Sequence, residues 1–210
     1  SYNKLSKSFK KKNILHLCGD VQQKKFLVKA KKIIKKKFKT IDILIANAGR
    51  VKLNSKNLSK KKIFDCNFYP TSTLVNFFKK DLCKNTNGSI ILISSIAAIA
   101  KTSAPLGFIK AKSKNNQIGK KLALELSKNN VNVNIVAPGN IYIKKGNWDI
   151  KMKENKKEVI RYIKKNVPMK RFVYPEEVAN LCLFLADRNS KSITGQIIAI
   201  DGGQSLQAIK

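Results

Sequence analysis

Small and polar residues follow five of the apolar segments in this sequence, and these residues are well suited to binding a ligand. They are Gly19-Asp20-Val21, Asn47-Ala48-Gly49, Ser94-Ser95, Pro138-Gly139-Asn140-Ile141 and Asp201-Gly202-Gly203. Glycine lets a ligand approach the backbone closely, and serine and asparagine side chains form hydrogen bonds. Any one of these groups is compatible with an ordinary turn. Because parallel strands end at a shared edge where ligands bind, five such groups in order predict one binding edge.

The single histidine and the cysteines argue against several other kinds of site. His16 lies within an apolar run, as a strand histidine would, so HExxH metal chemistry is excluded and a Ser-His-Asp triad is not expected. The cysteines show no CxxC spacing and lie in or beside apolar runs, where a thiol packs as a small hydrophobe. They are Cys18, Cys66, Cys83 and Cys182. We therefore expect no metal site and no disulfide, as in a protein of the reducing cytoplasm.

The elements that would position the five polar groups alternate along the chain. The expected strands are residues 14–18, 41–46, 89–94, 131–137 and 196–200, and the expected helices are residues 22–38, 58–83, 107–128, 159–165 and 175–187. In the first helix, apolar residues recur at spacings of three and four, with lysines on the opposite face. The alternation predicts an α/β fold: a parallel sheet with helices on both faces, in a single domain over residues 1–210.

The composition describes an ordinary folded domain with an unusual charge. The chain has 210 residues, a hydrophobic content of 43% and a formal net charge of +32. The lysines are spread along the chain and arginine is scarce, so we interpret the charge as the codon usage of an AT-rich genome. Nucleic acid is not an expected partner, because no helix-turn-helix or aromatic-interleaved basic segment is present. A membrane span is not expected either, because no apolar stretch approaches roughly 18 residues.

Six segments, taken in order and with their spacing, resemble the classical short-chain dehydrogenase/reductase family. They are DILIANAG (42–49), GSIILISS (88–95), KKLALEL (120–126), VNVNIVAPG (131–139), PEEVANLCLFLA (175–186) and ITGQIIAIDGG (193–203). The resemblance covers nearly the whole chain and implies a doubly wound, Rossmann-like parallel sheet. It also implies NAD or NADP as cofactor, a small carbonyl or alcohol substrate, and assembly as a homodimer or homotetramer.

The resemblance assigns catalytic roles to four positions. Ser95 matches the family's serine, which hydrogen-bonds the substrate oxygen, Lys112 matches its lysine, and Asn67 matches the asparagine that holds a water in the proton relay. The family's tyrosine, four residues before the lysine, is here Phe108. Phenylalanine keeps the ring but has no proton to transfer, and losing a general acid typically slows a reaction by about 10²- to 10⁴-fold. Tyr142 is the nearest tyrosine in sequence on the same edge.

The resemblance also assigns cofactor contacts along the binding edge. Asp20 and Val21 would contact the adenine, Asn47, Ala48 and Gly49 would pack along the ribose, and Pro138, Gly139 and Ile141 would meet the nicotinamide carboxamide, with Lys112 beside them. The family's TGxxxGxG turn, which holds the pyrophosphate, is not in these 210 residues. We expect a fragment or a truncated gene, with a sheet that lacks the family's first two strands and the Gly-rich phosphate loop.

These features lead to three expectations. Residues 144–172 lie where the family keeps its substrate lid, and Trp148 is the expected packing anchor of that segment. The function implied is an NAD(P)-dependent oxidoreductase impaired by Phe108, and the alternative is a non-catalytic member that keeps only scaffold and oligomer contacts. For the sheet, we expect residues 14–18 to pair directly with residues 41–46, because unpaired strand edges are costly and prone to aggregation. The alternative is a gap between these two segments, which would leave the edge of residues 41–46 unpaired and the chain unstable.

Overall fold

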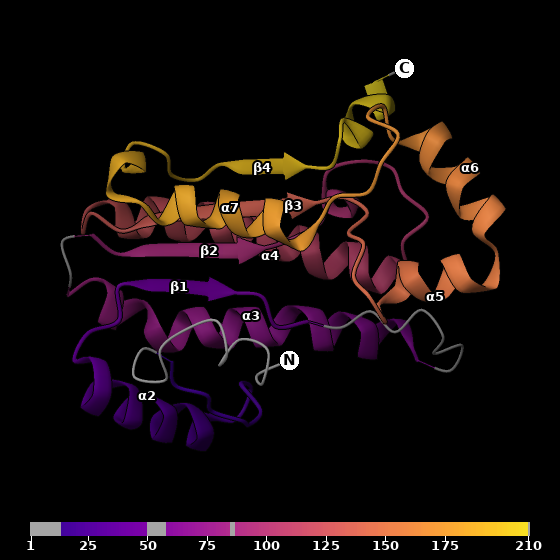
Figure 1. Ribbon diagram of the computed structural model, residues 1–210. Coiled ribbons are helices and arrows are strands. Elements are labelled where there is room, and N and C mark those ends of the chain that lie inside the picture. The colour runs from indigo at the N-terminus through magenta and orange to yellow at the C-terminus, as the bar shows by residue number, and fades with distance from the viewer. Residues whose placement is uncertain (1–13, 50–57, 85–86, 210) are drawn as a thin grey trace.

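The computed structural model describes residues 14–49, 58–84 and 87–209 of the chain (Figure 1). The strands are β1 Ile43–Ala46, β2 Ser89–Ile93, β3 Asn132–Pro138 and β4 Ile197–Ile200. The helices are α2 Lys24–Phe38, α3 Lys60–Leu82, α4 Leu106–Ser127, α5 Asn147–Glu154, α6 Lys156–Asn166 and α7 Pro175–Ala186. Short 3₁₀ turns are η2 Ile96–Ala98, η3 Arg188–Ser190 and η4 Gln204–Ile209. The alternation of strands and helices confirms the α/β prediction.

Within the described ranges the sheet has four strands in the order β1-β2-β3-β4, and every neighbouring pair is parallel. Helices α3 and α4 cover one face, and α7 covers the other over β2 and β3 (Figure 1). The residues of β2 and β3 are almost all buried, as expected for strands covered on both faces. The carboxyl ends of all four strands therefore meet at one edge, which is where the polar groups follow them.

Gly119 allows α4 to lie close to the sheet. A Cβ added there would lie 2.8 Å from the Ile135 side chain and 2.9 Å from Leu92. Leu122 and Leu126, further along the same helix, belong to the apolar cluster between α3, α4 and the sheet. This packing fixes the position of α4, the helix that carries Phe108 and Lys112.

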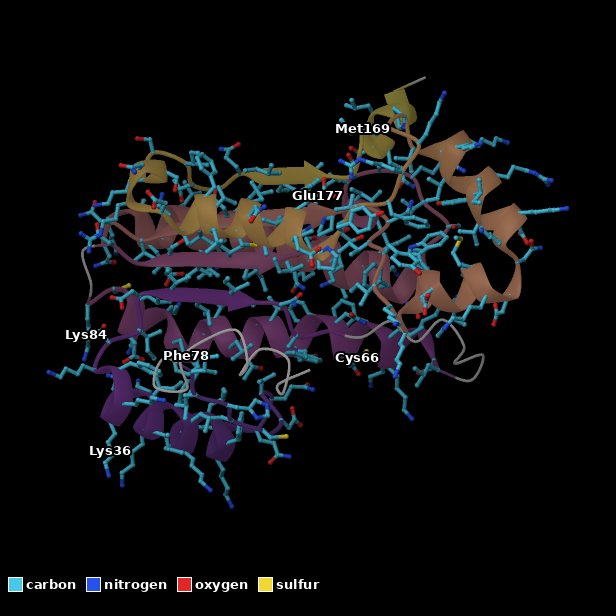
Figure 2. All side chains as sticks on the ribbon, in the orientation of Figure 1. Lys36, Cys66, Phe78, Lys84, Met169 and Glu177 are labelled. Atoms are coloured by element: carbon cyan, nitrogen blue, oxygen red, sulfur yellow. The ribbon has the colours of Figure 1, made fainter. Side chains whose placement is uncertain are left out.

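The expected pairing of residues 14–18 with β1 is wrong, because residues 14–18 form no strand. Helix α2 packs on the outer side of α3, where Lys31 and Lys35 contact Asp81 at 2.5 and 2.7 Å (Figure 1). The segment before α2 is therefore held beside that helix, with Lys37 Nζ donating to the Ile14 carbonyl at 2.8 Å. Figure 2 shows the lysine side of α2, including Lys36, directed away from the rest of the molecule.

Strand β1 consequently lies at an edge of the sheet. Ala46 is fully buried on the α3 side, whereas Ile43 and Ile45 are 48% and 46% exposed. These two isoleucines alternate with the partly buried Leu44 and the buried Ala46, and they face the side on which α7 covers only β2 and β3. The sequence pattern, which reads as a strand buried on both faces, does not reveal this exposure.

The segment between β3 and α7 forms two helices at the carboxyl end of the sheet (Figure 1). Only the second was expected from the sequence. Asn155 separates them: it ends α5, and its side chain accepts a hydrogen bond from the Glu158 amide at 3.1 Å, which caps α6. In the described part of the chain, no helix is both long enough and apolar enough to cross a bilayer.

Candidate active site

A cavity of about 910 Å³ lies at the carboxyl ends of the strands, beneath α5 and α6. Nine of the expected site residues line it. They are Asn47, Gly49, Asn67, Ser95, Phe108, Lys112, Pro138, Gly139 and Ile141. Residues separated by up to about ninety positions in the sequence thus meet at one edge, because the parallel strands all end there.

Asp20 and Val21 are not among the residues that line this cavity. The Asp20 carboxylate accepts a hydrogen bond from the Gln22 amide at 2.9 Å, and the Asp20 carbonyl accepts one from Gln23 at 3.0 Å. Asp20 therefore shapes the turn that leads into α2. Ala48 also does not line the cavity, although both of its chain neighbours do. The structure brings together the expected nicotinamide and substrate residues, but not the expected adenine residues.

Lys112 is a buried amine at the centre of the site. It is only 6% exposed, and its Nζ donates a hydrogen bond to the Ile93 carbonyl at 2.8 Å. Burial lowers the pKa of Lys112 to about 8, because the charged ammonium loses hydration, while Cys66 acts in the opposite direction. Cys66 lies on α3, on the carboxyl-end side of the sheet (Figure 2).

Phe108 lies one helical turn before Lys112, so the two side chains share a face of α4. The Lys112 ammonium lies 5.7 Å from the centre of the Phe108 ring, a distance at which the ring face attracts a cation. The ring lines the cavity without any hydroxyl group. At this position the site offers a surface for packing and no proton.

Ser95 and Asn67 are positioned by local hydrogen bonds. Ser95 Oγ accepts from the Ala97 amide at 3.2 Å and caps the η2 turn directly after β2. The buried Asn67 side chain donates to the Ile63 carbonyl at 2.8 Å, and the Asn67 carbonyl accepts from Asn115 of α4 at 3.0 Å. The contact between Asn115 and Asn67 joins α4 to α3.

Gly49 passes close to the side chains of Asn67 and Lys112. A Cβ at position 49 would lie 2.9 Å from Asn67 Oδ1 and 3.7 Å from Lys112 Nζ. Only glycine fits so close to Asn67 without displacing it. The space over the Lys112 amine is therefore left open partly by the absence of a side chain at position 49.

The lid residues form an aromatic cluster that the sequence pattern does not predict. The Trp148 ring stacks on Tyr162 at 5.4 Å and lies 5.5 Å from Phe172, which in turn lies 5.6 Å from Tyr142. Both Trp148 and Tyr162 line the cavity, and Lys151 lies 4.9 Å over the Trp148 ring. The cavity thus combines an aromatic wall with the polar edge of the sheet.

Two tyrosine hydroxyls lie near the site, in different environments. Tyr142 donates to Asp149 at 2.7 Å, a hydrogen bond that raises the pKa of this phenol, and Tyr142 does not line the cavity. Tyr162 does line it, and its hydroxyl accepts from Gln204 at 3.4 Å. Tyr162 was missed in the sequence because it lies in a charged amphipathic helix, where an aromatic residue indicates ordinary packing.

Comparisons with known proteins agree with this architecture. The family model described as enoyl-(acyl carrier protein) reductase matches residues 1–205. The chain is 35% identical over 179 residues to 3-oxoacyl-(acyl-carrier-protein) reductase FabG of Buchnera aphidicola subsp. Acyrthosiphon pisum, covering 83% of this chain and 70% of that protein. It is 30% identical to FabG of Buchnera aphidicola subsp. Baizongia pistaciae, covering 95% and 81% of the two chains.

Solved structures show the same fold. A short chain dehydrogenase family protein from Francisella tularensis superposes with a TM-score of 0.80 at 25% identity, covering 95% of this chain and 84% of that one. An NADPH-bound short chain oxidoreductase from Pseudomonas aeruginosa, described as containing an atypical catalytic center, gives a TM-score of 0.85 at 20% identity, covering 97% and 81%. From its fold, its ordered motifs and these relatives, the chain belongs to the short-chain dehydrogenase/reductase family of oxidoreductases.

Proposed function

We propose that this protein is an NAD(P)-binding short-chain oxidoreductase for a small carbonyl or alcohol substrate, and that its chemistry is impaired in the 210-residue chain. The observation that carries the proposal is Phe108, which lies beside the buried Lys112 ammonium where the family has its tyrosine. The names of the FabG relatives support a reductase, and the NADPH in the Pseudomonas structure supports a nicotinamide cofactor.

The residues at the carboxyl edge fit the nicotinamide end of such a cofactor. Gly49 leaves room over Asn67 and Lys112, and Pro138, Gly139 and Ile141 line the opposite part of the cavity. The Lys112 ammonium would hydrogen-bond the ribose hydroxyls, and the Ser95 hydroxyl would hold the substrate oxygen. When bound, the nicotinamide supplies or accepts the hydride.

The residues expected at the adenine end fit less well. The Asp20 carboxylate is engaged with the Gln22 amide, and Asp20 lies outside the cavity. We therefore expect this chain to bind a dinucleotide weakly, mainly through its nicotinamide half.

Residues 144–172 serve as the substrate lid in this proposal. Helices α5 and α6 border the cavity, and Trp148 and Tyr162 would contact the substrate opposite Ser95. A carbonyl compound with an apolar substituent matches this combination of an aromatic wall and a single serine hydroxyl. The lid's contacts with the rest of the chain would then exclude water from the reacting carbonyl.

Proton transfer is the step that this site performs poorly. Phe108 has no ionisable group, and the Tyr142 phenol is held by Asp149 outside the cavity. The alternative function, a non-catalytic member that keeps scaffold and oligomer contacts, draws on the same substitution. We propose a homodimer or homotetramer in either case, supported by the exposed apolar side chains of Leu124, Leu183 and Phe184.

Turnover assays test the proposal directly. We expect no detectable oxidation of NADH or NADPH by the 210-residue chain with common carbonyl substrates. Phe108→Tyr alone should not restore turnover, because the proton donor returns while dinucleotide binding remains weak. Phe38→Tyr, at an exposed position at the end of α2 and outside the cavity, is the matched control. Quenching of Trp148 fluorescence by NADPH measures binding separately, and turnover by the unmodified chain would contradict the proposed impairment.

A further inference from the structure

Lys112 is an amine without an acidic partner in the part of the chain that the structure describes. None of the ion pairs among those residues includes it, and its hydrogen bond goes to a neutral backbone carbonyl, that of Ile93. A buried ammonium in this setting is destabilised relative to the neutral amine. The site therefore favours release of a proton from Lys112.

The groups packed around Lys112 do not reverse its preference for the neutral amine. Helix α3 presents the Cys66 thiol, which raises the pKa of Lys112 by less than burial lowers it, to a net value of about 8. Strand β2 presents the Ile93 carbonyl, and the hydroxyl of Ser94, directly after β2, donates to the Lys112 carbonyl at 3.5 Å. On α4 itself, Lys110 and Lys114 are exposed to solvent. At pH 7, about one molecule in ten would carry the neutral amine.

The amine borders a cavity large enough for a small organic molecule. Its one described acceptor is the Ile93 carbonyl, and the Phe108 ring offers no hydroxyl group to bind it. The backbone of Gly49 leaves space above Nζ, and Ser95 supplies a hydroxyl elsewhere in the same cavity. These are the conditions under which a desolvated lysine becomes a nucleophile toward carbonyl compounds.

We propose that Lys112 forms a covalent imine with a small aldehyde or ketone bound in this cavity. This is an activity distinct from hydride transfer, and it requires no nicotinamide cofactor. It shares with the proposed function the cavity, the residues Lys112 and Ser95 and the preference for carbonyl compounds, but it uses Lys112 as the neutral amine and not as the ammonium.

The step balances without an oxidant or a reductant. The lone pair of neutral Lys112 Nζ attacks the carbonyl carbon, and the carbonyl π electrons move to the oxygen, which takes up a proton as the nitrogen loses one. The resulting carbinolamine then expels its hydroxyl group as water, using a proton from solvent, while the nitrogen lone pair forms the C=N bond, and the protonated imine nitrogen returns a proton to solvent. The products are one imine and one water. The Ser95 hydroxyl would hydrogen-bond the oxygen before it leaves.

Pentane-2,4-dione is a suitable probe, because its adduct with an amine is a stable conjugated enaminone that absorbs in the near ultraviolet. The native chain is incubated with a limiting amount of the diketone at pH 7, and the modified lysines are located by peptide mass spectrometry. Each adduct adds the mass of the diketone less one water. A pKa of about 8 against 10.5 gives Lys112 an about 300-fold larger neutral fraction than an ordinary lysine. Allowing for reduced access, we expect Lys112 to be labelled at least about tenfold faster than Lys114.

Two variants and one denatured control sharpen the test. Lys112→Arg should abolish the fast-forming adduct, because arginine keeps the charge but is not a nucleophile, whereas Lys114→Arg should leave the adduct unchanged. If Lys112→Arg does not fold, the native chain labelled in urea replaces it, and there the preference for Lys112 should disappear. Equal labelling of Lys112 and Lys114 in the native chain would overturn the proposal. Because no nicotinamide is present, that result would leave the oxidoreductase proposal untouched, and the absence of turnover would not affect the labelling.

Discussion

Replacing Lys112 by methionine measures how strongly the buried ammonium destabilises the fold. Because burial lowers the pKa of Lys112 from 10.5 to about 8, the unfolded chain binds a proton between these pH values that the folded chain has released. The free energy of unfolding of the native chain therefore rises with pH through this window. At about 1.36 kcal/mol for each pKa unit, the contribution of Lys112 to that rise is about 3 kcal/mol.

The assay compares urea unfolding of the native chain and Lys112→Met from pH 7 to pH 10.5, followed by the fluorescence of Trp148, the only tryptophan. The exposed lysines titrate in both chains, so their effects cancel in the difference between the two unfolding free energies. The variant should lose about 3 kcal/mol relative to the native chain as the pH rises from 7 to 10.5.

The hydrogen bond from Lys112 to the Ile93 carbonyl affects the comparison differently. Its loss leaves a buried acceptor unsatisfied and lowers the stability of the variant by about 1–3 kcal/mol at every pH. It therefore displaces the whole profile without changing its slope. Lys114→Met, on the exposed side of the same helix, should give a profile parallel to that of the native chain. If the Lys112→Met profile is also parallel, to within about 1 kcal/mol, the ammonium is not desolvated and the reasoning fails.

Two further predictions concern the packing that positions the site. Asp81→Asn should lower the free energy of unfolding by about 1–3 kcal/mol at pH 7, because Lys31 and Lys35, each about one-third exposed, lose their carboxylate partner. Burial opposes ionisation of Asp81, but the two lysines outweigh it and lower its pKa below 3.8, so the difference should vanish as the pH falls below that value in acid titrations. Gly119→Ala should lower the free energy of unfolding measured in urea by about 1–3 kcal/mol, because the added methyl group would meet Ile135 and Leu92. An unchanged midpoint of urea unfolding would show that α4 can move away from the sheet.

The sequence predicts correctly those parts of the site that are placed by helix spacing or by the ends of parallel strands. Phe108 and Lys112 are four positions apart in a helix, so their shared face follows from the sequence alone. The meeting of Ser95, Gly139 and Gly49 follows almost as directly, because each ends or follows a parallel strand.

Sequence reasoning failed where the outcome depends on a partner distant in the chain. Residues 14–18 have the composition of a strand, but pairing requires α2 to cross toward the sheet edge, and the contacts of α2 with Asp81 hold it on the outside of α3. The role of Tyr162 is equally non-local, because its position in the cavity depends on stacking against Trp148 from another helix. Neither contact leaves a periodic signal in the sequence.

The energetics of Lys112 bear on the choice between a working site and a scaffold that has lost its function. A methionine would fill nearly the same space beside Phe108 without the loss of hydration that an ammonium suffers on burial. At neutral pH this loss of hydration costs about 3 kcal/mol, and the hydrogen bond to the Ile93 carbonyl offsets about 1–3 kcal/mol of that cost. A scaffold that only packs gains nothing from such a residue, whereas sites that bind or react commonly retain groups that destabilise the fold. The Phe108 side chain has no proton to transfer, whereas the Lys112 amine lines the same cavity and can react, so chemistry at Lys112 is the activity to measure first.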